Sequence, residues 1–484
     1  MSKKAVQKIQ VNSEIGRLRK LLVHSPDSGL GKVVPSKAQD WLFEDIVHLE
    51  TIRGKEYDYY TKLLLYFLDY DKIIGKLSEI DNPKQNRNFF KPGKPEFHNS
   101  EYVVELQTLL AEILADSNIK NQLTASVCAI ENCNYATQNR LLELSDNQLA
   151  NVFISGSIKE EAMIFAPIPN FIFTRDIGIT INNHILLNKP AKKARTREAL
   201  LAKYIFFNHP IFKDYRDNII EIPDLSLSFL LPKDGDDKKV TLEGGDVMIV
   251  SKDHLLIGVS ERTSWEAAHH SIKILFDKKI VKKITVVKIP KKRDYMHIDT
   301  VFTQVKRNVW VMLGNFSRKA QKGLDSDPIE QGLDYTNRKE DKLKIIQFNR
   351  KNLNETVHFN SLEELLTDIS VNDLGCKKEE VKFIFSGNNE FPFDAREQWT
   401  DSCNLLALKD GVVIGYDRND KTLEAFKKLG FQSVEITELL QKFESKKLKP
   451  DDVKDTIILM PSAELSRARG GFHCMSMPLL RDDI

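Results

Sequence analysis

A cysteine near the C-terminus, Cys474, is the strongest candidate nucleophile in the sequence. It follows two arginines, Arg467 and Arg469, and the glycine pair Gly470 and Gly471. Glycines allow a tight bend that can present a side chain to a cavity, and nearby arginines favour a thiolate or bind an anionic group. Because an unpaired cysteine is more often a small buried apolar residue, the interpretation depends on partners elsewhere in the chain.

His297 is the candidate acid–base partner of this cysteine. It lies in the segment Tyr-Met-His-Ile-Asp-Thr, and histidine is the residue best suited to proton transfer near neutral pH. We expect the segment to be a strand, in which His297 and Asp299 point to the same face and enter one pocket. The competing interpretation is a histidine at the end of a strand, hydrogen-bonded to a neighbour.

Carboxylates form the third part of the candidate site. Glu243 and Asp246 precede an apolar strand, and Asp176 follows Phe-Thr-Arg; each could also be a turn or cap residue. An acyl hydrolase needs hydrogen-bond donors directed at an oxyanion, whereas carboxylates suit a cation. Guanidinium presents five N–H donors in a plane, and one carboxylate accepts two of them. The pattern therefore favours a planar cation as substrate.

The elements that must position these residues alternate between strands and helices. Strand candidates cover residues 17–23, 179–187, 247–259, 284–289, 309–313, 405–416 and 457–460, and helical candidates cover 265–276 and 423–429. Residues 53–165 differ, because apolar positions such as 103, 106, 109, 110 and 113 recur at helical spacing. The pattern predicts an α/β protein with a helical insertion near its N-terminus.

The composition excludes several classes of function. Of 484 residues, 71 are Lys or Arg and 69 are Asp or Glu, so the net charge of +2 gives no electrostatic reason for a nucleic-acid or membrane partner. Neither a membrane span nor the apolar run of a signal peptide is evident, and we expect a cytoplasmic protein. Five cysteines favour reduced thiols, and their spacing argues against a zinc site.

Six motifs, in the same chain order, resemble those of the arginine deiminases in the guanidino-group-modifying superfamily. They are Glu-Ile-Gly-Arg-Leu-Arg-Lys at 14–20, Phe-Thr-Arg-Asp at 173–176, Glu-Gly-Gly-Asp at 243–246, Met-His-Ile-Asp-Thr-Val-Phe at 296–302, Arg-Glu-Gln-Trp at 396–399, and Arg-Gly-Gly at 469–471 leading into Cys474. The resemblance runs from about residue 14 to the C-terminus and is weakest at 50–165 and 318–380. No single motif is decisive, but six in order argue against coincidence.

This resemblance implies a pseudo-fivefold α/β propeller (the pentein fold) of ββαβ modules around a central pocket. Residues 1–52 would begin the propeller, 53–165 would form a mainly helical insertion, and 166–484 would complete it, with a charged surface excursion near 318–380. The resemblance also implies hydrolysis of arginine to citrulline and ammonia without a metal or organic cofactor.

The family's functional residues carry over position by position. Cys474 matches the nucleophile and His297 the general acid and base. Asp176 and Asp299 match carboxylates that hold the guanidinium, and Glu243 matches a carboxylate near the guanidinium and the histidine. The groups matching those at the amino-acid end of the substrate are Asn170, Arg195, Arg262 and Arg469, with Phe173 as an aromatic wall against the aliphatic stem.

The chain departs from the family pattern around the substrate's distal end. It has Ser-Arg-Ala-Arg at 466–469 where Gly-Arg-Gly-Arg is common, a bulky Phe472, and an atypical Thr-Asp-Ser-Cys at 400–403. Alternatives therefore remain: hydrolysis of another guanidine, a dihydrolase that continues to ornithine, an amidinotransferase, or a non-catalytic arginine-binding protein. The expected partner is a small guanidino compound such as arginine, and a homo-oligomer is left open.

Overall fold

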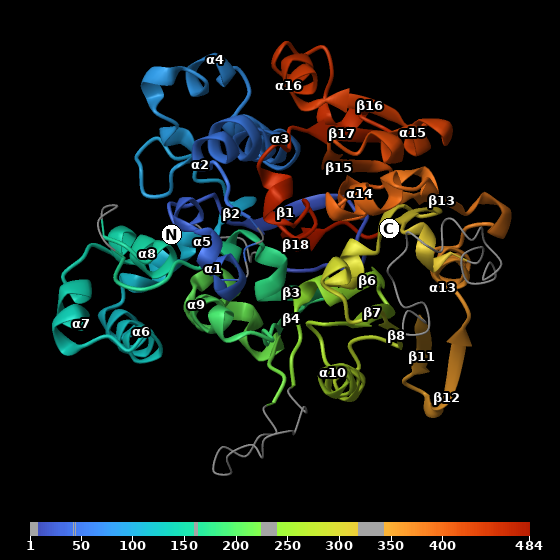
Figure 1. The fold of residues 1–484 in the computed structure, drawn as a ribbon, viewed down its shortest axis with the longest axis horizontal. Helices are drawn as coiled ribbons and strands as arrows, with labels where there is room; N and C mark the ends of the chain where they lie inside the picture. Colours follow the sequence, from blue (N-terminus) through green and yellow to red (C-terminus); the bar gives the residue numbers. More distant parts are fainter. Residues whose placement is uncertain (1–7, 42, 44, 159–162, 224–239, 318–342) are drawn as a thin grey trace.

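Five β-sheets flanked by helices make up the protein in the computed structural model, which describes residues 8–41, 43, 45–158, 163–223, 240–317 and 343–484 (Figure 1). The strand orders of these sheets are β18-β1-β2, β3-β4-β5, β12-β11-β8-β7-β6, β13-β10-β9 and β14-β15-β17-β16. The predicted α/β class is confirmed. No helix within the described ranges is long and apolar enough to cross a membrane.

The same connectivity recurs in every sheet: two antiparallel strands, a helix, and a further strand parallel to the second. Four of these ββαβ units follow one another along the chain. They are β3 (Gly178–Ile181), β4 (His184–Leu187), α9 (Thr196–Asn208) and β5 (Ile219–Ile220); β6 (Val247–Ser251), β7 (His254–Val259), α10 (Trp265–Asp277) and β8 (Lys283–Lys288); β9 (Phe302–Lys306), β10 (Val309–Met312), α13 (Leu362–Asp368) and β13 (Lys382–Phe385); and β14 (Leu406–Lys409), β15 (Val412–Tyr416), α15 (Asp420–Lys428) and β17 (Thr456–Met460).

The fifth unit joins the two ends of the chain. Strand β18 (Met477–Arg481) pairs antiparallel with β1 (Leu18–Val23), and β1 pairs parallel with β2 (Val103–Glu105) after helix α3 (Asp58–Leu68). Cys474 lies three residues before β18, so the pairing of the chain ends determines where the sulfur sits. Five units of one connectivity are what the predicted modular fold requires, and the closure of these units into a propeller stays a prediction.

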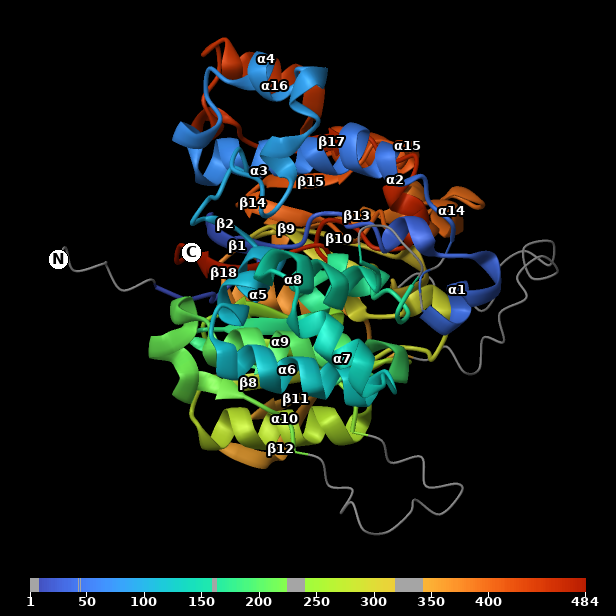
Figure 2. The same cartoon turned by 90° about the vertical axis from the view of Figure 1, so that its left-hand side faces the viewer.

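The N-terminal half carries most of the remaining helices. They are α1 (Pro35–Trp41), α2 (Leu49–Thr51), α4 (Leu77–Ile80), α5 (Leu106–Leu114), α6 (Ser117–Ile130), α7 (Tyr135–Leu142) and α8 (Asp146–Ser155). Asp116 and Asn134 cap the N-termini of α6 and α7, and Gly156 ends α8 with a φ of 75°. Helices α5 to α8 lie together on one side of the molecule (Figures 1 and 2).

Most of the predicted 53–165 segment is thus helical, although β2 lies within it and belongs to the sheet of β1. Helices α5, α6 and α8 share one apolar core with α9 of the next unit, through residues such as Leu110, Leu123, Phe153 and Phe206. The boundaries 1–52, 53–165 and 166–484 stay predictions.

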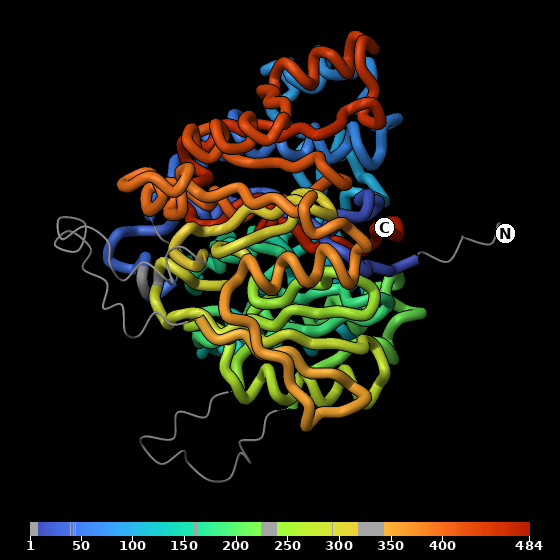
Figure 3. The backbone as a smooth tube through the Cα atoms, turned by 90° about the vertical axis from the view of Figure 1, so that its right-hand side faces the viewer, coloured from blue at the N-terminus to red at the C-terminus, as the bar shows by residue number. Residues whose placement is uncertain are grey.

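The charged segment predicted near 318–380 falls partly on residues 318–342, which lie outside the described part of the chain. After it, β11 (Lys344–Asn349) adds to β8, and β12 (Asn352–Phe359) forms the edge of that sheet with mostly exposed residues. This hairpin runs along the side of the molecule opposite α6 and α7 (Figures 1 and 3). The last elements are α14 (Phe393–Trp399), β16 (Gln432–Glu435) and α16 (Ile436–Glu444).

Candidate active site

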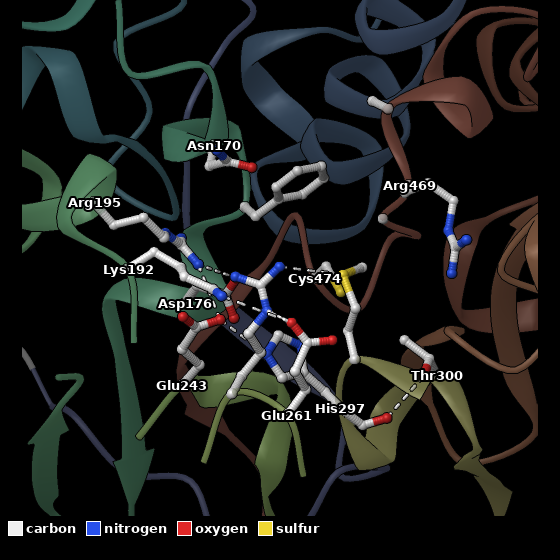
Figure 4. A pocket seen from close by; sticks show the side chains of 15 residues that line it. Asn170, Asp176, Lys192, Arg195, Glu243, Glu261, His297, Thr300, Arg469 and Cys474 are labelled. Atoms are coloured by element: carbon white, nitrogen blue, oxygen red, sulfur yellow. Dashed lines mark hydrogen bonds and ion pairs between the residues drawn. The ribbon is translucent and has the colours of Figure 1, made fainter. Parts of the chain in front are cut away.

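A cavity of about 190 Å³ collects nine of the ten predicted site residues (Figure 4). They are Asn170, Phe173, Asp176, Arg195, Glu243, Arg262, His297, Arg469 and Cys474. Lys192, Glu261, Met296 and Thr300 also line the cavity and were not predicted. The tenth predicted residue, Asp299, is fully buried and lies behind the cavity wall.

Short 3-10 turns, rather than strands, present the site residues. One turn lies just before the first strand of each of three units: Thr174–Ile177 before β3, Gly244–Asp246 before β6 and Ile298–Thr300 before β9. The corresponding places before β18 and β14 hold Cys474 and residues 400–404. The expectation of a strand around His297 and Asp299 is wrong. In the turn the two side chains face different partners, and only His297 lines the cavity.

Cys474 is buried, with two polar contacts to its sulfur. The Asn404 side-chain N–H donates to Sγ over 3.2 Å, and Sγ lies 3.4 Å from Oδ2 of Asp299. Burial, followed by the negative charges of Asp299, Asp176 and Asp401, raises the pKa of the Cys474 thiol well above its ordinary value. The thiol is therefore protonated at neutral pH as long as no cation is bound.

His297 and Glu243 form a hydrogen-bonded pair on the cavity wall, with Nε2 and Oε2 3.0 Å apart. Burial disfavours the charged ring, but Asp176 and the hydrogen bond to Glu243 outweigh it and raise the pKa of His297 from 6.5 to about 10. Gly245 is essential to this arrangement, because a Cβ there would lie 2.4 Å from Nδ1 of His297. His297 is thus an imidazolium at neutral pH and is ready to donate a proton.

Asp176 is bound to an arginine of the protein itself. Nη1 of Arg195 lies 2.8 Å from Oδ2 of Asp176 and 3.3 Å from Oε2 of Glu243, while its Nε donates to Glu198 over 2.7 Å. A guanidinium group thus already lies against Asp176, which was predicted to hold the substrate's guanidinium, and against Glu243, which was predicted to lie near it. The geometry of this pair demonstrates that planar cations fit there.

Behind the sulfur, Asp299 belongs to a buried charged network that sequence reasoning missed. Oδ2 of Asp299 lies 2.9 Å from Nδ1 of His473, whose Nε2 lies 3.2 Å from Oε2 of Glu14 and 2.8 Å from Nη2 of Arg175. Arg175 also donates to Glu14 over 3.1 Å. The only signals in the sequence were membership of motifs: Glu14 opens the first one, and His473 directly precedes the cysteine.

Three arginines, Arg195, Arg262 and Arg469, also line the cavity. Each has a buried nitrogen without a hydrogen-bond partner among the described residues: Nη2 of Arg195, Nε of Arg262, and both Nε and Nη1 of Arg469. Arg469 stacks on the ring of Trp399 with its guanidinium carbon 3.7 Å from the ring centroid, and it lies across the site from Arg195 (Figure 4). Unsatisfied cationic donors of this kind suit a carboxylate ligand.

A metal ion is a weaker fit to this site than an organic cation. Asp176, Glu243 and His297 each offer a ligand atom within 4.8 Å of the others, which is a spacing that a metal could use. Arg195 already pairs with both carboxylates, and the raised pKa of His297 keeps its nitrogens protonated, whereas a metal needs a neutral imidazole.

Comparison with known proteins decides the family. Residues 116–481, more than half of the chain, match the family model described as arginine deiminase. The chain belongs to the arginine deiminase family. Within this family, the arginine deiminase of Borrelia duttonii (strain Ly) is 30% identical over 500 residues, which cover 98% of each chain. That of Staphylococcus haemolyticus (strain JCSC1435) is 29% identical over 502 residues, covering 98% of this chain and 99% of its own.

Two solved structures that align with the chain share little sequence with it. SxtG, an amidinotransferase from Microseira wollei, is 13% identical and aligns over 98% of each chain with a TM-score of 0.46. The N-terminal domain of ArgZ, an arginine dihydrolase from cyanobacteria, is 13% identical and aligns over 65% of this chain and 76% of its own with a TM-score of 0.36. The predicted membership of the arginine deiminase family is confirmed by the family model and the relatives.

Proposed function

We propose that this protein hydrolyses L-arginine to L-citrulline and ammonia. The observation that carries the proposal is one cavity lined by a cysteine, an imidazolium and two carboxylates together with three arginines. That distribution of charge complements a substrate with a guanidinium at one end and a carboxylate at the other. Membership of the arginine deiminase family supports the same substrate.

In the first half of the proposed reaction, substrate binding activates the thiol. The incoming guanidinium takes the place of the Arg195 guanidinium against Asp176. Contact of Asp299 with the guanidinium stays a prediction, because this residue does not line the cavity. The added positive charge lowers the pKa of Cys474, and the thiol proton leaves to solvent. The thiolate attacks the guanidinium carbon, His297 protonates one terminal nitrogen, and ammonia departs.

In the second half, water releases citrulline. The carbon is now bound to Sγ of Cys474 as an amidino group, and His297, neutral after the first proton transfer, removes a proton from the attacking water. The C–S bond breaks as the carbonyl of citrulline forms, the hydroxyl proton passes to the departing sulfur to restore the thiol, and the protonated His297 is restored. Glu243 stays hydrogen-bonded to His297 through both halves and orients the ring.

The three arginines would hold the amino-acid end. Their unpartnered N–H groups would donate hydrogen bonds to the α-carboxylate, with Asn170 and Phe173 along the aliphatic stem. Arg195 would exchange its contact with Asp176 for the carboxylate, so that a group of the protein occupies the guanidinium position until substrate displaces it. A cytoplasmic location and a homo-oligomer stay predictions.

Incubation of the purified protein with L-arginine tests the proposal. We expect citrulline and ammonia in equal amounts and no ornithine, with turnover abolished in Cys474→Ala. Ornithine would indicate a dihydrolase, and arginine binding without turnover in the unaltered protein would indicate a sensor. Agmatine, which lacks the carboxylate, is the matched substrate control and should react far more slowly, because the three arginines then have no anionic partner.

A further inference from the structure

Asn404 contacts the candidate nucleophile with both ends of its side-chain amide. Its Nδ2 donates to Sγ of Cys474 over 3.2 Å, and its Oδ1 accepts the backbone N–H of the same residue over 3.1 Å. Asn404 is buried, with 1% of its surface exposed, and it does not line the cavity. The side chain therefore touches the sulfur from behind, where it cannot meet substrate.

The position of Asn404 is fixed by its surroundings. Its backbone N–H donates to the carbonyl of Asp401 over 3.0 Å, and Nδ2 also lies 3.3 Å from the carbonyl oxygen of Asp299. Gly471 packs so closely that a Cβ there would lie 2.5 Å from the Asn404 carbonyl oxygen and 2.7 Å from Oδ1. A glycine is therefore needed at position 471 so that the backbone can pass close to Asn404.

The two polar contacts of the sulfur favour opposite protonation states. Oδ2 of Asp299 can accept a hydrogen bond from the thiol but repels a thiolate. The N–H of Asn404 strengthens as a hydrogen bond when its acceptor becomes charged, so it favours the thiolate. Among the described residues, Asn404 is the one whose side chain is shown donating a hydrogen bond to Sγ.

We propose that Asn404 is a positioning residue of the reaction: its amide orients Cys474 and stabilises the thiolate that attacks the guanidinium carbon. The inference rests on the proposed function for its role in catalysis, but its effect on the cysteine can be measured without any substrate. The hydrogen bond to sulfur also lowers the pKa of Cys474, against the larger opposing effects of burial and the carboxylates.

The pH dependence of alkylation of Cys474 by iodoacetamide tests the proposal. Asn404→Leu removes the donor without adding charge, and Asn404→Ala removes it in the same way with a smaller side chain. Loss of a hydrogen bond to a charged acceptor should move the alkylation profile to higher pH by about 1–2 units. The Cys474→Ala variant reports labelling of the other four cysteines, which is subtracted.

Activity supplies a second readout. If the protein turns over arginine, we expect kcat to fall about 10- to 100-fold in either variant while KM stays within about threefold, because Asn404 does not touch substrate. The matched control is Asn308→Leu. Asn308 lies in the turn between β9 and β10, outside the cavity, and donates to the carbonyl of Glu380; the alkylation profile should not move.

The outcomes separate this inference from the proposed function. A shifted profile in a protein that makes no citrulline would support the role of Asn404 and refute the substrate. An unshifted profile in a variant whose circular dichroism and thermal unfolding match the parent protein would overturn the role of Asn404, whatever the activity. If Asn404→Leu fails to fold, the Asn404→Ala profile decides alone, since that variant also removes the donor without adding charge.

Discussion

At the scale of single residues, the charge states of Cys474 and His297 determine how the site can work. Carboxylates and burial raise the pKa of the thiol, and carboxylates raise the pKa of His297 to about 10 despite burial. Near neutral pH the unliganded site therefore holds a thiol and an imidazolium. Since the imidazolium already carries its proton, the missing element is the thiolate, and a bound cation can supply the electrostatic stabilisation it needs.

A nonreactive guanidine ligand should therefore activate the cysteine. We expect the pH profile of iodoacetamide alkylation to move to lower pH when the ligand is present, because its positive charge offsets Asp176 and Asp299. The turnover rate should rise with pH as the thiol ionises and fall again above about pH 10 as His297 loses its proton. Coincident alkylation profiles with and without ligand would show that the thiol is not activated by substrate charge.

Glu14 gives a prediction about stability at the same scale. Burial alone would raise its pKa, but Arg175 and His473 outweigh that effect and lower it. Because the folded-state pKa lies below the unfolded value, the stabilisation is present above about pH 4.5 and is lost as the pH falls. Glu14→Gln leaves Arg175 buried without its carboxylate and should cost about 3–5 kcal/mol at pH 7.

Urea unfolding at pH 7 and at about pH 4 measures that difference, which should shrink at the lower pH. The matched control is Glu424→Gln, since Glu424 forms a surface ion pair with Lys421 and should change stability little at either pH. An equal loss of unfolding free energy in both variants would show that the buried network of Glu14 stabilises the fold no more than a surface ion pair does.

At the scale of elements, the turns before the strands determine which side chains meet. The motifs hold most of the predicted residues that line the cavity, because three of the motifs hold a turn that lies just before a strand. The sequence could not reveal that His297 and Asp299 face different partners, since their directions depend on a 3-10 turn. Nor could it reveal the contact of Asn404 with Cys474 or the contacts of His473 with Asp299 and Glu14, because distances between remote segments leave no trace in one sequence.

Substitution of Gly245 tests whether the close packing of this turn against His297 is needed for activity. In Gly245→Ala the new Cβ would lie 2.4 Å from Nδ1 of His297, so the ring must move. A displacement of about 1 Å in a catalytic group can lower the rate about 100-fold, and overpacking costs about 1–3 kcal/mol of stability. We therefore expect a large fall in kcat while the variant stays folded, with only a modest decrease in its thermal unfolding temperature.

Gly54→Ala is the control for this substitution, because the nearest atom to a Cβ at Gly54 is 3.9 Å away, at ordinary contact distance. Its kcat should equal that of the parent protein. Full activity in a correctly folded Gly245→Ala variant would mean that His297 tolerates a different position and would weaken its assignment as the acid and base.

At the scale of the whole molecule, the unit that joins the chain ends is the one on which the site depends most. Its strand β2 has only three residues, yet it must hold β1, which in turn pairs with β18 next to Cys474. His24 follows β1 directly, and its two ring nitrogens lie 3.0 Å from Glu105 at the end of β2 and 3.2 Å from Asp27. This bridge compensates for the short pairing of β1 with β2.

The bridge should make the protein sensitive to alkaline pH. Burial alone would lower the pKa of His24, but the hydrogen bonds to Asp27 and Glu105 outweigh it and raise the pKa to about 9. A folded-state pKa above the unfolded value of 6.5 means that the stabilisation is complete below about pH 6.5 and is lost as the pH rises through 9. The size of the effect is about 3 kcal/mol.

Urea unfolding of the parent protein at about pH 6.5 and pH 9.5 measures this loss, to which His297, with its pKa of about 10, also contributes. His24→Gln should therefore be less stable than the parent at pH 6.5 and should lose less stability between the two pH values. His269→Gln, which changes an exposed histidine of α10, should retain the full dependence of the parent. If His24→Gln lost as much stability between pH 6.5 and 9.5 as the parent protein does, His24 would be a neutral buried residue. The ends of the chain would then be held by strand pairing and apolar packing alone.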